Sequence, residues 1–288
     1  MPEVALKPQA ETLKRIYVLL KSKTLLDFAL DSLDGVIGKV RDLYFDDQYW
    51  TIRYLVADTG NWLTDRQVLI SPHALVAMNK DERLISVKLT QKQIEGSPSL
   101  DSALTVSRQF EAAYFGYYQW PKYWVGPHRW GAHPGLVRDD ETLKPPPPLG
   151  QAWDPHLRST HAVLGYHIQA LDGEIGHVVD FIIDDETWAI RYLVVDTQEW
   201  WLDKHVLVAP QWLGSVSWNE SKVFINLTRE TLKLAPEYTD WSVLTEEFEA
   251  ALHHYYMRQG GVSEAPAQPA AGPPAGRPKG THNAIAVK

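Results

Sequence analysis

The stretch WTIRYLVADT at residues 50–59 decides the fold, because it recurs as WAIRYLVVDT at residues 188–197, 138 positions further along the chain. The segment before it recurs at the same spacing: LDGVIG at residues 33–38 returns as LDGEIG at residues 171–176. Between residues 33–75 and 171–213, 23 of the 43 paired positions are identical, with no insertion or deletion. The chain therefore contains two copies of one module, and the positions kept in both copies show what that module needs.

Within each copy the apolar residues follow the two-residue period of β-strands. In residues 50–58, Trp50, Ile52, Tyr54 and Val56 share one face, and the other face is also largely apolar. Two apolar faces are typical of a central strand in a small closed barrel. We therefore expect a mainly β fold, with strands over residues 37–45, 50–58, 67–70, 75–78 and 84–89, a turn at 46–49, and short second-copy strands at 205–208, 213–216 and 222–227.

Turn and cap residues mark the ends of these elements. Asp34-Gly35 and Asp172-Gly173 are dipeptides typical of hairpin turns. Each copy then ends in an expected α-helix, for which Ser107 and Thr245 are suitable N-caps. Aromatic and apolar residues recur at helical spacing after both caps, so we expect each helix to pack on its own module.

The repeat and the proline pattern define four segments. The two modules span residues 13–118 and 158–258, each including its C-terminal helix. A Pro- and Trp-rich linker covers residues 119–157, and its run Pro145–Pro148 favours a stiff extended spacer. We expect the first half of this linker to dock on a module. The Pro-, Ala- and Gly-rich tail at residues 259–288 is expected to be disordered.

One consequence of the repeat concerns charged residues in the central hairpin. If Phe45 faces Trp50 across the hairpin, Asp42 lies opposite Arg53, and in the second copy Asp180 lies opposite Arg191. Opposite charges across a strand pair stabilise it and fix its register. We interpret Asp42–Arg53 and Asp180–Arg191 as structural ion pairs.

The composition excludes several classes of function. A formal net charge of −8 argues against a nucleic-acid partner, because phosphate binding needs a basic surface. The chain has no cysteine, so thiolate metal sites and thiol nucleophiles are excluded. No histidine within the repeat has a histidine counterpart, which argues against a metal centre of the module, and we expect no cofactor. Neither a signal peptide nor a membrane span is recognisable, so a cytoplasmic protein is expected.

Repeated aspartates are the remaining candidates for chemistry. Asp34 and Asp46-Asp47 fall at expected turn tips, where aspartate is favoured because it bonds the local backbone. The alternative hypotheses are a weak divalent-cation site and an Asp-dependent hydrolase, and the hydrolase needs these carboxylates to converge in one pocket. No catalytic motif is present, and we expect no enzymatic activity.

The order LDG-x-IG-x-V-x-D, then DD-x-x-W-x-IRYLV-x-DT, then VL-x-x-P, resembles the PRC-barrel family. The resemblance covers about residues 23–118 and 161–256. The family includes the cytoplasmic domain of the photosynthetic reaction-centre H subunit and a domain of a ribosome-maturation factor. It implies two tandem small β-barrels that act as adaptors for protein partners.

These observations favour a cytoplasmic adaptor or stress-associated scaffold that binds protein partners. Trp62, Trp200 and Trp201 fall in an expected loop, where large aromatic residues either anchor a partner or fill the barrel mouth. The first alternative is an accessory in electron transfer that resembles the reaction-centre H subunit at a membrane surface. The fused modules are expected to form a pseudo-two-fold pair, and whether that pair dimerises again is left open.

Overall fold

A computed structural model describes residues 19–60, 62–63, 67–98, 106–124, 157–197, 204–239 and 244–259. The same order of elements occurs in both copies. The first copy contains β1 (Leu19–Lys21), α1 (Ser22–Leu25), β2 (Ala29–Ser32), β3 (Gly35–Asp46), β4 (Thr51–Asp58), β5 (Val68–Ile70), η1 (Pro72–Ala74), β6 (Leu75–Asn79), β7 (Leu84–Val87), α2 (Gln91–Glu95) and α3 (Arg108–Tyr117). The second contains β8 (Leu157–Ser159), α4 (Thr160–Val163), β9 (His167–Ala170), β10 (Gly173–Asp184), β11 (Ile190–Asp196), β12 (His205–Val208), η2 (Pro210–Trp212), β13 (Leu213–Ser217), β14 (Lys222–Ile225), α5 (Arg229–Leu234) and α6 (Glu246–Gln259).

The strands form two seven-stranded sheets with matching topology. One has the order β5-β4-β3-β2-β7-β6 and the other β12-β11-β10-β9-β14-β13, each with one further strand off this path. Neighbouring strands are antiparallel except β2 with β7 and β9 with β14, which are parallel. Among the described strands no pairing joins β5 to β6 or β12 to β13. Among the described strands, the pairing therefore does not close either sheet into a barrel. The mainly β class is confirmed.

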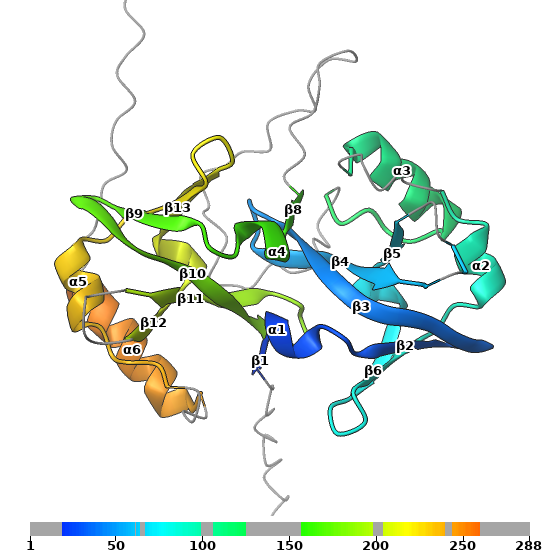
Figure 1. The fold of residues 1–288 in the computed structure, drawn as a ribbon, viewed down its shortest axis with the longest axis horizontal. Helices are drawn as coiled ribbons and strands as arrows, with labels where there is room; N and C mark the ends of the chain where they lie inside the picture. The colour runs from blue at the N-terminus through cyan, green and yellow to red at the C-terminus, as the bar shows by residue number, and fades with distance from the viewer. Residues whose placement is uncertain are drawn as a thin grey trace, which may run out of the picture.

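The two sheets exchange their first strands. β1 is the first strand of the first copy but pairs with β10 of the second, with Leu20 opposite Ile183. β8 is the first strand of the second copy but pairs with β3 of the first, with Arg158 opposite Phe45. Figure 1 shows β1, α1, β8 and α4 together at the centre of the molecule, while α3 and α6 lie at opposite ends.

A second contact joins the two sheets where β4 and β11 begin. The Ile52 amide donates to the Trp188 carbonyl at 2.8 Å, and the Ile190 amide donates to the Trp50 carbonyl at 2.7 Å. Trp50 and Trp188 have positive φ angles of 49° and 60°, a conformation uncommon for residues other than glycine. The backbone is thus turned at equivalent positions of the two copies, where each hairpin meets the other.

The hydrophobic core continues across both copies. One cluster of buried side chains runs from Leu20 to Tyr256, and the rings of Phe45 and Phe181 meet within it at 5.5 Å between centroids. A smaller cluster lies under α3 and includes Tyr54, Tyr114 and Phe115. The two sheets therefore share apolar contacts as well as strands.

Both C-terminal helices pack on their own sheets, as expected. Ser107 and Thr245 accept hydrogen bonds from the amides of Phe110 and Phe248, which confirms both as caps. Tyr114 Oη donates to the Leu69 carbonyl at 2.7 Å, and Tyr256 Oη donates to the Leu207 carbonyl at 2.9 Å. Each helix is thus fixed to the strand that follows the central hairpin of its own copy.

The long strands and the hairpin turns agree with the sequence expectations. The exchanged strands β1 and β8 and the short helices α1, α2, α4 and α5 were not predicted. Part of the expected linker packs on the first copy, because Tyr123 is 2% exposed and Trp120 stacks on His73. Residues 125–156 and the tail from residue 260 lie outside the described residues. In the described part of the chain, no helix has the length and apolar character needed to cross a bilayer.

Candidate functional site

The repeated aspartates Asp42 and Asp180 lie at the contact between the copies. Asp42 accepts hydrogen bonds from Ser159 Oγ at 2.5 Å, Thr160 Oγ1 at 3.1 Å and the His161 amide at 3.2 Å. These donors lie at the start of α4, which belongs to the other copy. In the mirrored contact Asp180 accepts from Ser22 Oγ at 2.6 Å and from the Lys23 amide at 3.3 Å. Each copy therefore caps the first helix of the other.

The predicted register that paired these aspartates with arginines is wrong. Asp42 lies opposite Val56, and Asp180 lies opposite Val194. Irregularities between Val40 and Asp42 and between Tyr44 and Phe45 shift the pairing of β3 with β4. Such bulges insert an unmatched residue and change which side chains oppose each other. The ion pairs of Arg53 and Arg191 are instead made with other acidic residues.

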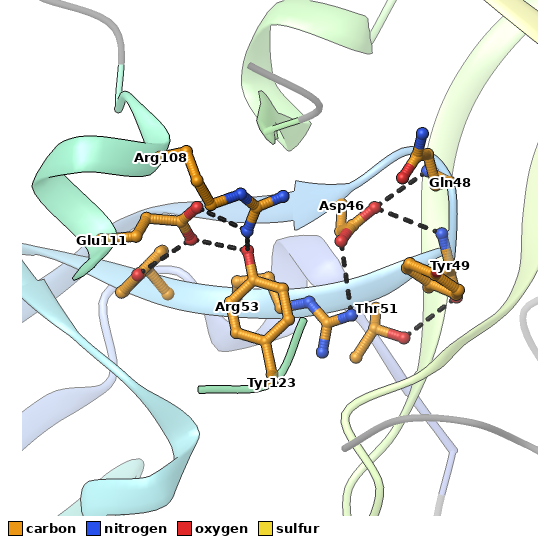
Figure 2. Close-up of polar contacts among 9 residues, drawn as sticks. Asp46, Gln48, Tyr49, Thr51, Arg53, Arg108, Glu111 and Tyr123 are labelled. Atoms are coloured by element: carbon orange, nitrogen blue, oxygen red, sulfur yellow. Dashed lines mark hydrogen bonds and ion pairs between the residues drawn. The ribbon is translucent and has the colours of Figure 1, made fainter. Parts of the chain in front are cut away.

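Arg53 is buried within the first copy, next to the turn between β3 and β4. Its guanidinium pairs with Asp46 at 3.3 Å, and both side chains are 2% exposed. The Tyr123 ring lies 3.9 Å from the guanidinium carbon, a cation–π contact. Asp46 also accepts from the amides of Gln48 and Tyr49, so one carboxylate holds both the turn and the arginine (Figure 2).

Glu111 on α3 is the centre of a second group of polar contacts, which Tyr123 connects to Arg53. Its carboxylate accepts from Tyr123 Oη, from Tyr54 Oη at 3.1 Å and from Arg108 at 2.7 Å. Arg108 also donates to Tyr123 Oη at 2.9 Å. Figure 2 shows Tyr123 between the Glu111–Arg108 pair and Arg53. The residues of β4, α3 and the expected linker are thus joined by charged hydrogen bonds, which are stronger than neutral ones.

Burial shifts the pKa values of the groups in this cluster. Desolvation raises the pKa of Glu111, and the Arg108 charge together with the tyrosine hydrogen bonds partly offsets this effect. Desolvation and the neighbouring Glu111 carboxylate raise the pKa values of Tyr54 and Tyr123 well above 10. The two phenols therefore stay protonated and donate to the carboxylate at neutral pH.

The second copy keeps the centre of this network. Arg191 pairs with Glu249 of α6 at 3.2 Å, and Tyr192 Oη donates to the same carboxylate at 2.8 Å. Glu111 and Glu249 were missed from the sequence, although both stand in a repeated Phe-Glu-Ala-Ala segment, at 110–113 and 248–251. Retention of a charged residue on the apolar side of both helices was the available signal. The cluster holds each helix to its own central hairpin.

The turn aspartates lie where the sequence predicts, and each has a further role. Asp34 accepts from the Gln91 amide at 2.7 Å, and Asp172 accepts from the Arg229 amide at 2.8 Å. Each therefore binds the first residue of the short helix α2 or α5. Gly35 and Gly173 have φ angles of 146° and 139°, which suit glycine at these turns.

Of the three candidate partner-binding tryptophans, only Trp62 falls within the described residues. It follows β4, is partly buried and packs against the large hydrophobic cluster. Trp200 and Trp201 lie outside the described residues. The partial burial of Trp62 is compatible with both expectations, a partner anchor and a residue that fills the barrel mouth.

Within the described ranges, no three His, Asp or Glu side chains gather in a way that could hold a metal ion. The repeated carboxylates are instead distributed between turns, helix starts and the helix–sheet contact. Comparison of the chain with protein-family models and with curated proteins yielded no match.

Proposed function

We propose that this protein is a non-enzymatic cytoplasmic adaptor, built from two PRC-type modules that are fused into one strand-exchanged body and bind protein partners. The proposal rests on the sequence resemblance to the PRC-barrel family and on how the copies use their shared polar residues. The two tandem sheet units agree loosely with the expected pair of small barrels, although the described strands of each sheet form an open path.

The observation that carries the proposal is that the repeated charged residues make hydrogen bonds and ion pairs with other residues of the same chain. Asp42 and Asp180 cap helices, Asp34 and Asp172 hold turns, and Glu111 with its twin Glu249 anchors a helix. Residues engaged in this way support architecture. These repeated charged residues therefore hold the body of the module together, and recognition is assigned to the surface of the molecule.

The loop between β4 and β5 is our candidate for that recognition surface. Trp62 supplies a partly buried indole there, and the equivalent loop of the second copy carries Trp200 and Trp201. Tryptophan is enriched among residues that dominate the binding energy of protein interfaces, because it buries a large area at small entropic cost.

A quantitative pull-down from native lysate tests the proposal. The bait is the full chain, and the variant carries Trp62→Ala together with Trp200→Ala. The matched control is Val76→Ala, which removes an exposed apolar side chain from β6, at the opposite end of the strand order from β5. We expect a defined set of proteins to be enriched by the wild type and by the control and lost with the double variant.

Purified candidates should then bind the wild type directly, with an affinity at least about tenfold higher than for the double variant. Far-UV circular dichroism of both variants checks that the fold is intact. Unchanged capture by the double variant would remove the loop from the proposal, and no reproducible partner for the wild type would contradict the adaptor role.

A further inference from the structure

A pocket of about 400 Å³ opens between the exchanged strand β1 and the turn that joins β6 to β7. It is lined by Leu20, Thr24, Phe28, Lys80 and Arg83. Phe28 and Leu20 are 1% and 8% exposed and form an apolar floor. Lys80 and Arg83 bring two positive charges to its rim. The pocket therefore combines an aromatic floor with cationic sides.

The equivalent place in the second copy is occupied by side chains. Trp218 stands at the position of Lys80, Tyr166 at that of Phe28 and Arg158 at that of Leu20. The Trp218 ring meets the Tyr166 ring edge-on, with centroids 5.8 Å apart, and the Arg158 guanidinium lies 4.8 Å from the Trp218 ring. An indole is thus held between an aromatic ring and a cation.

The first copy has an aromatic ring, Phe28, at the position of Tyr166, but Leu20 replaces Arg158, Lys80 replaces Trp218, and the nearby cation is Arg83. Lys80 reaches across to Asp185 of the second copy at 3.0 Å, and Asp185 is the twin of Asp47, which pairs with Arg158. Arg83 lies over the Phe28 ring at 5.6 Å and donates to the Leu26 carbonyl at 3.0 Å. Because Lys80 stands where the second copy has Trp218, this position of the first copy carries no aromatic ring, and the pocket lies beside Phe28 and Arg83.

We propose that this pocket binds a small planar aromatic carboxylate. The aromatic ring takes the place of the Trp218 indole, against Phe28 and beside Arg83, and the carboxylate meets the Lys80 ammonium. The volume lies within the range of about 300–1,000 Å³ that small-molecule sites occupy. Asp185 and the exposed Asp81 and Glu82 of the same turn add negative charge nearby, which favours ligands with a single carboxylate.

Isothermal titration of the full chain with indole-3-propionate tests this site, with indole and propionate as separate arms. We expect saturable binding of indole-3-propionate, binding of neutral indole that is weaker by about fivefold, and no detectable binding of propionate. The Lys80→Trp variant copies the second half and fills the pocket. It should weaken binding by at least about tenfold while the protein stays folded, since the twin site accommodates the same residue.

A second variant, Arg83→Ser, copies Ser221 of the other half and leaves the Lys80–Asp185 pair in place. It should weaken binding of indole-3-propionate by about fivefold. If Lys80→Trp lowers the melting temperature strongly, the affinity of Arg83→Ser is the test of the site. Wild-type affinity in Arg83→Ser or in a folded Lys80→Trp protein would overturn the proposal. So would propionate binding as well as indole-3-propionate, or no saturable binding to the wild type.

Discussion

Ser22 donates a hydrogen bond to Asp180 at 2.6 Å, although the two residues are separated by 158 positions in the sequence. Ser159 makes the mirrored bond to Asp42. In both cases the donor belongs to the short strand–helix segment that begins one copy and packs on the sheet of the other copy. The acceptor is an aspartate that occurs at the same position in both copies. These two bonds tie each exchanged strand to the sheet that receives it.

Asp180→Ala should lower the free energy of unfolding by about 2 kcal/mol, because it leaves the buried Ser22 hydroxyl and the Lys23 amide with a lost acceptor. Urea denaturation followed by circular dichroism measures this change. The matched control Asp172→Ala removes a helix-start acceptor on the surface, where its side chain is 45% exposed, and should cost about 0.5–1 kcal/mol. Equal effects of the two variants would contradict a special role of the contact between the copies.

Separate halves of the chain should assemble with each other. Fragments that cover residues 1–124 and 150–288 each lack the strand that completes their sheet, which the other fragment supplies. Unpaired strand edges and the exposed part of the shared core favour association. We expect a one-to-one complex in size-exclusion chromatography with light scattering.

The control for this experiment is a first fragment that begins at residue 22 and therefore lacks β1. Loss of these strand hydrogen bonds should weaken the complex by about tenfold or more. Two fragments that remain folded and separate in the mixture would show that strand exchange contributes little to the joining of the halves.

The fate of Asp42 shows what the sequence could and could not predict. Repetition correctly marked it as a residue that the module needs, and the alternating pattern predicted the strands on both sides of it. Its partner could not be predicted, because a hairpin argument assumes an unbroken ladder and searches only within one copy. Leu43 pairs with Leu55 after a bulge, and the true donor, Ser159, lies in a three-residue strand too short to show any periodicity.

The buried network illustrates the same limit for side chains. The repeated strand at residues 50–58 contains Arg53 and Tyr54. The apolar and aromatic residues at helical spacing predicted that α3 packs on the same module. Glu111 lies on the same helix, but a carboxylate on an apolar face is assigned to solvent unless its partners are known. Its carboxylate accepts hydrogen bonds from Tyr123 and Arg108, which have no counterparts of the same kind at the equivalent positions of the second copy.

The buried tyrosines predict how stability changes at alkaline pH. Burial raises the pKa values of Tyr54, Tyr114 and Tyr123 well above 10, whereas in the unfolded chain they ionise near 10. The folded state therefore binds more protons above pH 10, and the free energy of unfolding falls as the pH rises.

Tyrosinate absorbance and far-UV circular dichroism, recorded during the same pH titration, test this prediction. We expect one group of tyrosines to ionise while the protein is folded, and the remainder to ionise only as the circular dichroism signal is lost. Complete ionisation of all tyrosines with native circular dichroism would contradict the burial of these three phenols.

Gly38 and Gly176 should be the least replaceable glycines of the two sheets. A Cβ atom at Gly38 would lie 2.0 Å from the Asp58 carbonyl oxygen, and one at Gly176 would lie 1.7 Å from the Asp196 carbonyl oxygen. Both glycines also have positive φ angles, of 153° and 65°. An added methyl group must therefore displace the backbone of the neighbouring strand.

We expect Gly38→Ala to cost about 3 kcal/mol or more, or to prevent folding, because it combines a backbone clash with an unfavourable φ angle. Gly116→Ala is the matched control, since Gly116 lies in α3 and a Cβ atom there meets nothing within 4 Å. That change should stabilise the protein by about 0.5–1 kcal/mol, because alanine favours the helix and has less backbone freedom in the unfolded chain. Urea denaturation of both variants gives the comparison. Equal stability of the two would show that β3 can move away from the end of β4, and hence that the repeated Ile-Gly segment does not fix the path of the long strand.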